Sequence, residues 1–270
     1  MRIASVILLL VTALTSLAAQ DSVIFRDDAA ASLFRTSRMN MSGREATIRE
    51  LLALHMRGRI RIATPGGATE SGTTEIKVLL PDRYLRVDST PGVTRYSGFD
   101  RNLLLNAIKR GDSTSTVPEA LRAAALQSER RRFAYLMIGA TTYVSADLSP
   151  VIYAAGYGAD VRVVEGVDSN RDFLLRLEFG ESMLPTRLEY PGGTMTFADR
   201  RVADGLQMPF RITTTGGAGR LVDEITFDSI RVNSELSSDD FKISAGRRSA
   251  AAASAAARAA IRSRRARDPR

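Results

Sequence analysis

Few side chains in this sequence could carry acid–base or nucleophilic chemistry. Among its 270 residues there is one histidine, His55, and no cysteine. These counts exclude cysteine nucleophiles and histidine-rich zinc sites, and they leave a Ser-His-Asp triad possible only through His55. Because His55 continues the helical spacing of Ile48 and Leu51, we interpret it as a packing or hydrogen-bonding histidine near the end of a helix.

Carboxylates occur in adjacent pairs, at Asp27-Asp28, Asp223-Glu224 and Asp239-Asp240. Neighbouring residues of a strand point to opposite faces, so such pairs are poor acid/base partners, and we expect them on solvated faces or in turns. The sequence has no G-x-S-x-G motif and no phosphate loop; Gly156-Tyr157-Gly158 begins a G-x-G-x-x-G pattern, but Val161 takes the place of the third glycine. We therefore predict a protein that is not an enzyme and uses no metal or cofactor.

Basic residues are concentrated in two places. Arg130, Arg131 and Arg132 are consecutive; such a run on a helix is usually a solvated face, although it could bind phosphate head groups. Residues 247–270 hold eight arginines against Asp268, a surplus of seven, and Arg2 accounts for the rest of the net charge of +8. The part of the chain between Arg2 and residue 247 is therefore formally neutral, which argues against binding to nucleic acid.

The first nineteen residues have the pattern of a secretory signal peptide. A positive Arg2 precedes an apolar run over 3–14 and small residues at 16–19. We expect removal of 1–19, one domain over 20–245, and an Ala/Arg-rich tail over 246–270 that is disordered or forms a helix on an anionic membrane or lipopolysaccharide. The Ala and Arg content is typical of GC-rich bacterial genomes, so we expect export to the periplasm.

Helices are predicted in three places. Ser42-Gly43-Arg44-Glu45 matches a capping box, and the apolar stripe after it predicts a helix ending near Gly58. Thr116-Val117-Pro118-Glu119 predicts a second helix that ends at Gly139, with a break near Ser128. A short helix could also begin at Asp27-Asp28.

The remaining sequence alternates between apolar and polar residues with the period of strands. Pro-Gly, Asp-Gly and Gly-Gly corners separate these segments, as in antiparallel hairpins. We predict ten or eleven strands and two or three helices, in an α+β fold with a strongly curved antiparallel sheet covered by helices on one side. The predicted strands lie around Ile60 and Ile62, at Ile76–Leu80 and at Leu85–Val87, and over residues 94–98, 102–108, 161–167, 172–179, 184–190, 194–200, 207–215 and 220–232.

In this order, the elements resemble the LolA/LolB-like superfamily of periplasmic outer-membrane lipoprotein carriers and their relatives. The resemblance covers about residues 43–243, and the order and spacing of the elements carry it, because none of the motifs is a catalytic signature. The segments concerned are Arg57-Gly58-Arg59-Ile60, Leu80-Pro81-Asp82-Arg83-Tyr84-Leu85-Arg86-Val87, Phe99-Asp100, Arg132-Phe133-Ala134-Tyr135-Leu136, Leu184-Pro185-Thr186-Arg187-Leu188, the hairpin from Asp199 to Pro209, and Val232-Asn233 with Phe241.

The resemblance implies an incomplete β-barrel in which acyl chains of a lipid or lipoprotein lie between the sheet and a helical lid. The lipid carrier is the first functional hypothesis. The alternative is a protein-interaction or sensor module in which the protein's own side chains fill the same space. We predict that the acyl chains contact one face of two strands and one face of the lid, through Ile76, Val78, Leu80, Phe133, Leu136, Met137, Phe173, Leu175, Leu177 and Phe179.

Overall fold

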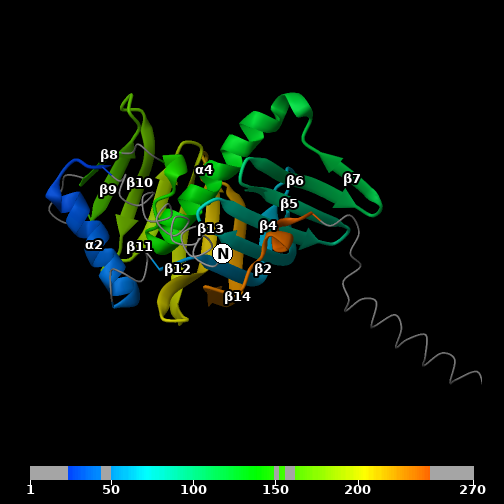
Figure 1. Ribbon diagram of the computed structural model, residues 1–270. Helices are drawn as coiled ribbons and strands as arrows, with labels where there is room; N and C mark the ends of the chain where they lie inside the picture. Colours follow the sequence, from blue (N-terminus) through cyan, green and yellow to red (C-terminus); the bar gives the residue numbers. More distant parts are fainter. Residues whose placement is uncertain (1–23, 44–49, 149–151, 156–161, 244–270) are drawn as a thin grey trace, which may run out of the picture.

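A single open sheet with two α-helices on its concave side forms the body of the protein (Figure 1). The computed structural model describes residues 24–43, 50–148, 152–155 and 162–243. The fourteen strands found there lie in the order β1-β8-β9-β10-β11-β12-β13-β14-β2-β3-β4-β5-β6-β7. They span β1 Ile24–Phe25, β2 Ala53–Ala63, β3 Thr69–Leu79, β4 Arg83–Thr90, β5 Val93–Asp100, β6 Leu103–Arg110, β7 Ser113–Thr116, β8 Ile152–Ala155, β9 Val163–Val167, β10 Phe173–Phe179, β11 Pro185–Tyr190, β12 Gly193–Ala203, β13 Leu206–Gly216 and β14 Leu221–Val232.

The sheet consists of two meanders joined by one long-range pair. β8 to β14 form the first and β2 to β7 the second, and β14 pairs with β2 so that Asp223 lies opposite Ile62 and Val232 opposite Leu54. Neighbouring strands are antiparallel except β1 and β8, which are parallel. The predicted α+β fold with a curved antiparallel sheet is confirmed. The structure has more strands than predicted because it contains three short ones, β1, β7 and β8. Strands of this length are too short to show alternation in the sequence.

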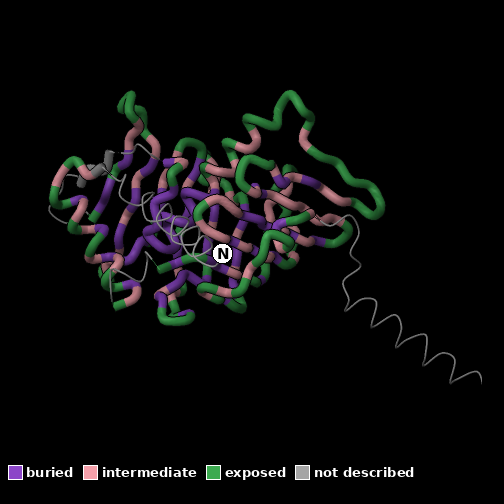
Figure 2. The backbone as a smooth tube through the Cα atoms, viewed as in Figure 1, coloured by how far each residue is buried: buried purple, intermediate pink, exposed green. Residues whose placement is uncertain are grey.

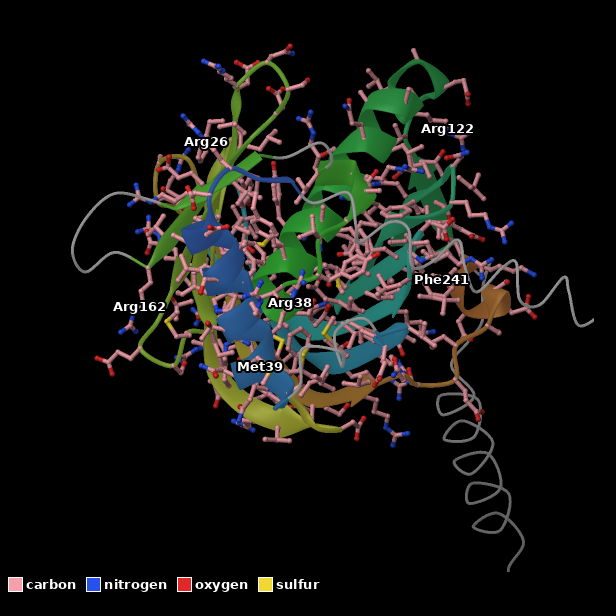
Figure 3. The ribbon with its side chains drawn as sticks, turned by 60° about the vertical axis from the view of Figure 1, so that its left-hand side comes forward. Arg26, Arg38, Met39, Arg122, Arg162 and Phe241 are labelled. Atoms are coloured by element: carbon pink, nitrogen blue, oxygen red, sulfur yellow. The ribbon has the colours of Figure 1, made fainter. Side chains whose placement is uncertain are left out.

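The two helices pack on the same side of the sheet. α2 (Asp28–Ser42) begins at Asp27, whose side chain accepts a hydrogen bond from the amide of Ala30, and it lies beside β8 and β13. α4 (Arg122–Thr141) packs against β5 and β6 of one meander and against β11, β12 and β13 of the other. Because one helix contacts both meanders, the sheet has to curve around it, as Figures 1 and 3 show. Neither described helix is long and apolar enough to cross a membrane.

The C-terminal end of α4 is fixed to the sheet by a glycine and an arginine. The predicted end at Gly139 is wrong, as is the break near Ser128, because α4 continues without interruption to Thr141. A Cβ atom at Gly139 would lie 2.0 Å from Cζ of the Phe197 ring, so the glycine allows helix and strand to approach closely. Arg200 on β12 donates to the carbonyl oxygens of Gly139 at 3.2 Å and Ala140 at 3.4 Å, which satisfies carbonyls left free at a helix end.

The helix predicted between Ser42 and Gly58 is wrong over the part that the structure describes. Gly43 has a φ of 72° and ends α2, so this turn marks the end of a helix; Arg44 and Glu45 lie outside the described residues. His55 belongs to β2, which pairs with β14 on one side and β3 on the other. Pairing on both edges fixes the segment as a strand, whatever its local helical spacing.

A second element differs from the prediction at the start of α4. Thr116 is the last residue of β7, and Pro118 precedes a short 3-10 helix, η1 (Glu119–Leu121), that leads into α4. Neither η1 nor α4 has a side-chain capping bond at its start. The proline thus marks the beginning of the helical region, but without the predicted capping box.

In β4 the charged residues Arg86 and Asp88, and not the apolar Leu85, face the concave side of the sheet. Tyr84, Arg86 and Asp88 are buried, and Arg86 and Asp88 share the concave side with the helices. Leu85 faces the other side, where it packs with Phe241 in a second small hydrophobic cluster. Phe241 belongs to the 3-10 helix η3 (Ser238–Phe241), which packs against β4. Because η3 covers the apolar residues, the polar ones can point inward.

Candidate functional site

Eight of the ten residues predicted to contact acyl chains lie in one buried hydrophobic cluster. This cluster joins α4 to both meanders, and its buried positions follow the inner side of the fold in Figure 2. Leu80 is partly buried and packs against the cluster. The eight buried residues are Ile76, Val78, Phe133, Leu136, Met137, Leu175, Leu177 and Phe179. The residues of the two strand faces and of α4 thus belong to the same apolar interior, and their contact with acyl chains stays a prediction.

Phe173 does not share the face of the other predicted residues, and its side chain is 45% exposed. In the pairing of β10 with β9, Phe173 lies opposite Val167 and Leu175 lies opposite Gly166, so the register shifts between them. Such a bulge turns the following side chains relative to the preceding ones. Alternation in the sequence could not reveal this shift.

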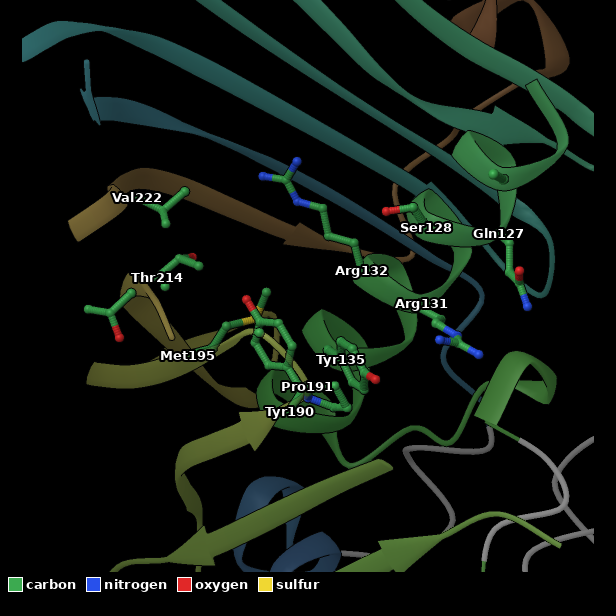
Figure 4. Close-up of a pocket in the computed structure, with 14 residues that line it drawn as sticks. Gln127, Ser128, Arg131, Arg132, Tyr135, Tyr190, Pro191, Met195, Thr214 and Val222 are labelled. Atoms are coloured by element: carbon green, nitrogen blue, oxygen red, sulfur yellow. The ribbon is translucent and has the colours of Figure 1, made fainter. Parts of the chain in front are cut away.

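A groove of about 430 Å³ opens between α4 and the strands β11 to β14 (Figure 4). Such a volume lies within the range of small-molecule sites. The residues that line it are Ala124, Gln127, Ser128, Arg131, Arg132 and Tyr135 from α4, Tyr190, Pro191 and Gly192 from the corner between β11 and β12, and Met195, Thr214, Thr215, Gly216 and Val222 from β12 to β14.

Two stacked tyrosines form one wall of the groove. The rings of Tyr135 and Tyr190 are 4.7 Å apart at an angle of 22°, and the Tyr135 hydroxyl donates to the carbonyl oxygen of Leu174 at 3.3 Å. Burial raises the pKa of both phenols, so both are neutral at physiological pH. Tyr135 and Met195 also belong to the buried hydrophobic cluster, so part of the groove wall is formed by side chains of the apolar interior.

A buried ion cluster lies beneath the groove. Arg86 donates from Nε to Asp88 Oδ2 at 2.8 Å and from Nη2 to Asp223 Oδ2 at 2.7 Å, and Thr74 donates to Asp88 Oδ1 at 2.6 Å. Burial alone would raise the pKa of Asp223, but the charges of Arg86 and Arg132 hold it below its ordinary value. Thr74, Arg86, Asp88 and Asp223 are all almost fully buried. The opposite charges therefore stabilise one another in place of solvent water.

α4 contributes two charged groups to this region. Arg132 extends over the groove toward Thr214 and Val222 in Figure 4, and its Nη2 lies 3.4 Å from Asp223 Oδ2. Burial raises the pKa of Glu129, and Arg132 and Arg86 oppose this shift. The Oε2 atom of Glu129 is buried without a hydrogen-bond partner in the described part of the chain. The ion cluster therefore links helix and sheet and holds Arg132 at the groove.

The ion cluster was not predicted from the sequence. Asp223 and Glu224 lie on opposite faces of the strand, as predicted, but the expectation of solvation is wrong for Asp223, which is 3% exposed. Glu224 points outward and pairs with Arg61 at 3.4 Å. The only local signal was the alternation of Arg86 and Asp88 with apolar residues in one strand, and this pattern usually indicates a solvated face.

The other candidates for chemistry have structural roles. Asp27 caps α2, and Asp240 accepts a hydrogen bond from the amide of Ser237 at 2.9 Å at the start of η3, as expected for turn positions. His55 is partly buried, and its Nε2 lies 2.8 Å from Glu75 Oε1. Within the described ranges no group of three or more acidic or histidine side chains is placed to hold a metal ion. Gly156-Tyr157-Gly158 lies outside the described residues.

No protein-family model matches the sequence, and no curated protein matches it. Among solved structures, a LolA superfamily protein from Nitrosomonas europaea is 11% identical, with 79% of this chain and 97% of that chain covered and a TM-score of 0.48. A domain from Vibrio parahaemolyticus assigned to outer-membrane lipoprotein sorting is 10% identical, with 70% and 89% covered and a TM-score of 0.46. A DUF1329 family protein from Desulfovibrio piger is 10% identical, with 81% and 99% covered and a TM-score of 0.48.

All three TM-scores lie below 0.5 and all three identities below 25%, so these likenesses do not assign the chain to a superfamily. At such identities and TM-scores they say nothing about what this chain binds.

Proposed function

We propose that the protein is an exported, non-enzymatic carrier that holds acyl chains of a lipid or lipoprotein between the curved sheet and α4. One observation carries this proposal: Tyr135 and Met195 line the open groove and also belong to the buried hydrophobic cluster. An acyl chain in the groove would lie against these two side chains, which are largely apolar and pack into the hydrophobic interior. Burial of each methylene group contributes about 0.8 kcal/mol, so no dedicated polar site is needed.

The proposal includes a signal peptide over residues 1–19, a carrier domain over 20–245 and a basic tail over 246–270, in the periplasm. The tail's surplus of positive charge supports contact with an anionic membrane or lipopolysaccharide. Export would also keep the chain away from cytoplasmic nucleic acid.

An alternative function is a protein-interaction or sensor module with a filled core. The burial of the eight predicted side chains favours it, because all eight belong to one packed hydrophobic cluster. In this case no acyl chain enters the space under α4, and partners bind at the surface.

Mass spectrometry of lipids extracted from the natively purified protein tests the carrier hypothesis, together with uptake of a hydrophobic fluorophore. A matched pair of variants then separates cavity from core. Val78→Phe enlarges a fully buried side chain, whereas Val202→Phe makes the same change at a residue that is 65% exposed.

Each outcome of this experiment decides between the two functions. If Val78→Phe abolishes uptake while its stability remains that of the parent, the carrier hypothesis is supported. If the parent takes up nothing and Val78→Phe loses about 1–3 kcal/mol of stability, as overpacked cores do, the core is filled and the carrier hypothesis fails. Val202→Phe should change neither uptake nor stability.

A further inference from the structure

The charge of the groove under α4 has one sign. Among its fourteen lining residues only Arg131 and Arg132 are charged, and none carries a carboxylate. The rest of its surface is apolar, aromatic, or neutral and polar. A groove of this kind is complementary to a ligand that combines an apolar part with a negative charge.

The positive charges of the two arginines differ in how far nearby carboxylates of the protein neutralise them. Arg132 lies 3.4 Å from Asp223, within the ion cluster. Arg131 is exposed, and in the described part of the chain it makes no hydrogen bond or ion pair. Asp223, Asp88 and Glu129 all lie on the side of Arg132 and Arg86, as their effects on one another's pKa values indicate. Arg131 is therefore the guanidinium group that remains available to a ligand.

We propose that this groove binds an anionic phospholipid, whose phosphate is held by Arg131 and whose acyl chain lies along the stacked rings of Tyr135 and Tyr190. This inference rests on the proposed carrier function and names the class of its ligand. A guanidinium group binds phosphate oxygens through two parallel hydrogen bonds, which a point charge does not offer. Ser128 and Gln127, next to Arg131 in the lining, supply further donors.

The apolar wall identifies the source of the phosphate as a lipid. Tyr135, Tyr190, Met195 and Val222 line the same groove, and a free phosphate ion would leave all four without contact. A lipid covers them and gains from the removal of apolar surface from water.

The test compares three fluorescent lipids with identical acyl chains: phosphatidylglycerol, phosphatidylcholine and diacylglycerol, which has no phosphate. Each is titrated against the full chain and against Arg131→Gln. Arg122→Gln is the matched control, because Arg122 lies at the start of the same helix (Figure 3) and does not line the groove. Its side chain pairs with Glu119. The basic tail is the same in the parent and in every variant, so its own attraction to anionic lipid cancels in the comparison.

We expect phosphatidylglycerol to bind most tightly, and Arg131→Gln to weaken it about tenfold or more, as expected for hydrogen bonds to a charged group. Binding of diacylglycerol should be unchanged in Arg131→Gln, and Arg122→Gln should match the parent for all three lipids. Arg131→Lys, which keeps the charge but loses the planar fork, should fall between the parent and Arg131→Gln.

Four results would overturn the inference. Equal binding of phosphatidylglycerol and diacylglycerol in every variant would refute phosphate recognition while leaving the carrier function intact. Displacement of phosphatidylglycerol by an equal concentration of inorganic phosphate would show that the site binds the free ion. A loss of stability in Arg131→Gln with equal losses for all lipids would show a structural role. If no lipid binds to the parent, the carrier function fails as well.

Discussion

Arg86 on β4 and Asp223 on β14 form an ion pair of 2.7 Å, although β2 and β3 lie between their strands in the sheet. Neighbouring strands are about 4.8 Å apart, so β4 and β14 would be separated by about 14 Å in a flat sheet. The pair forms on the concave side, where the long Arg86 side chain reaches across β3 and β2 to Asp223. Arg86 and Asp223 therefore tie the two meanders together on the side where α4 packs.

Loss of the carboxylate at Asp223 should strongly destabilise the protein. We expect Asp223→Ala to lower the free energy of unfolding by about 3–5 kcal/mol, because Arg86 would remain buried with only Asp88 to compensate it. Urea denaturation followed by circular dichroism measures the change. Asp228→Ala is the control on the same strand: Asp228 is 61% exposed and lies 3.6 Å from Arg59, so its loss should cost less than about 1 kcal/mol.

Asp223 should make the free energy of unfolding decrease as the pH falls into the acidic range. The pKa of Asp223 is lower in the folded protein than its ordinary value of 3.8, so the unfolded state binds protons more readily in this range. The stabilisation by Asp223 is complete above pH 3.8 and is lost as the pH falls further. Urea midpoints measured from pH 5 to pH 2 should fall steeply for the parent, and a parallel curve for Asp223→Asn would contradict the prediction.

Glu129 should have the opposite effect on the pH dependence of stability. Its pKa is raised above the ordinary value of 4.5, mainly by burial, so the folded state binds the proton more tightly and stability decreases as the pH rises past 4.5. Glu129→Gln keeps the shape and removes the charge, and we expect it to be more stable than the parent at pH 7 but not at pH 4. A variant that loses stability at pH 7 would instead show that the ionised carboxylate supports Arg132.

The strands from 161 to 232 could be predicted because their signals are local. Asp204-Gly205 and the other corners separate alternating segments, and the structure pairs β9 with β10, β11 with β12, and β13 with β14, as predicted. The segment around His55 could not be read locally, because helical spacing and strand alternation coincide there. Its strand conformation depends on β14, which lies more than 160 residues further along the chain.

The apolar part of the site could be predicted from strand alternation, but its polar part could not. Asp223 and Arg86 are 137 residues apart in the sequence, and neither is surrounded by a motif. Burial of Arg86 also requires η3 to cover the opposite face of β4 at Leu85. Such a reversal of faces depends on a distant segment and leaves no trace in the strand itself.

Gly139→Ala should destabilise the protein, although alanine is the better helix former by about 1 kcal/mol. The new methyl group would overlap the ring of Phe197, and overpacking of this kind costs about 1–3 kcal/mol. Gly66→Ala is the control, because a Cβ atom there meets nothing within 4 Å. In the double variant with Phe197→Leu, the smaller side chain should recover part of the loss, and purely additive effects would refute the proposed contact.

Deletion of residues 247–270 should separate stability from membrane binding. The tail carries the surplus of seven positive charges beside a formally neutral body, so we expect the unfolding midpoint to remain nearly unchanged. Binding to liposomes should fall, because each arginine near an anionic surface contributes on the order of 1 kcal/mol, screened by salt. Co-sedimentation of the full chain should rise with the anionic lipid content and decrease with salt. If the shortened and full chains sediment alike, the tail does not bind the membrane, and a large drop in the unfolding midpoint would show that it packs against the body.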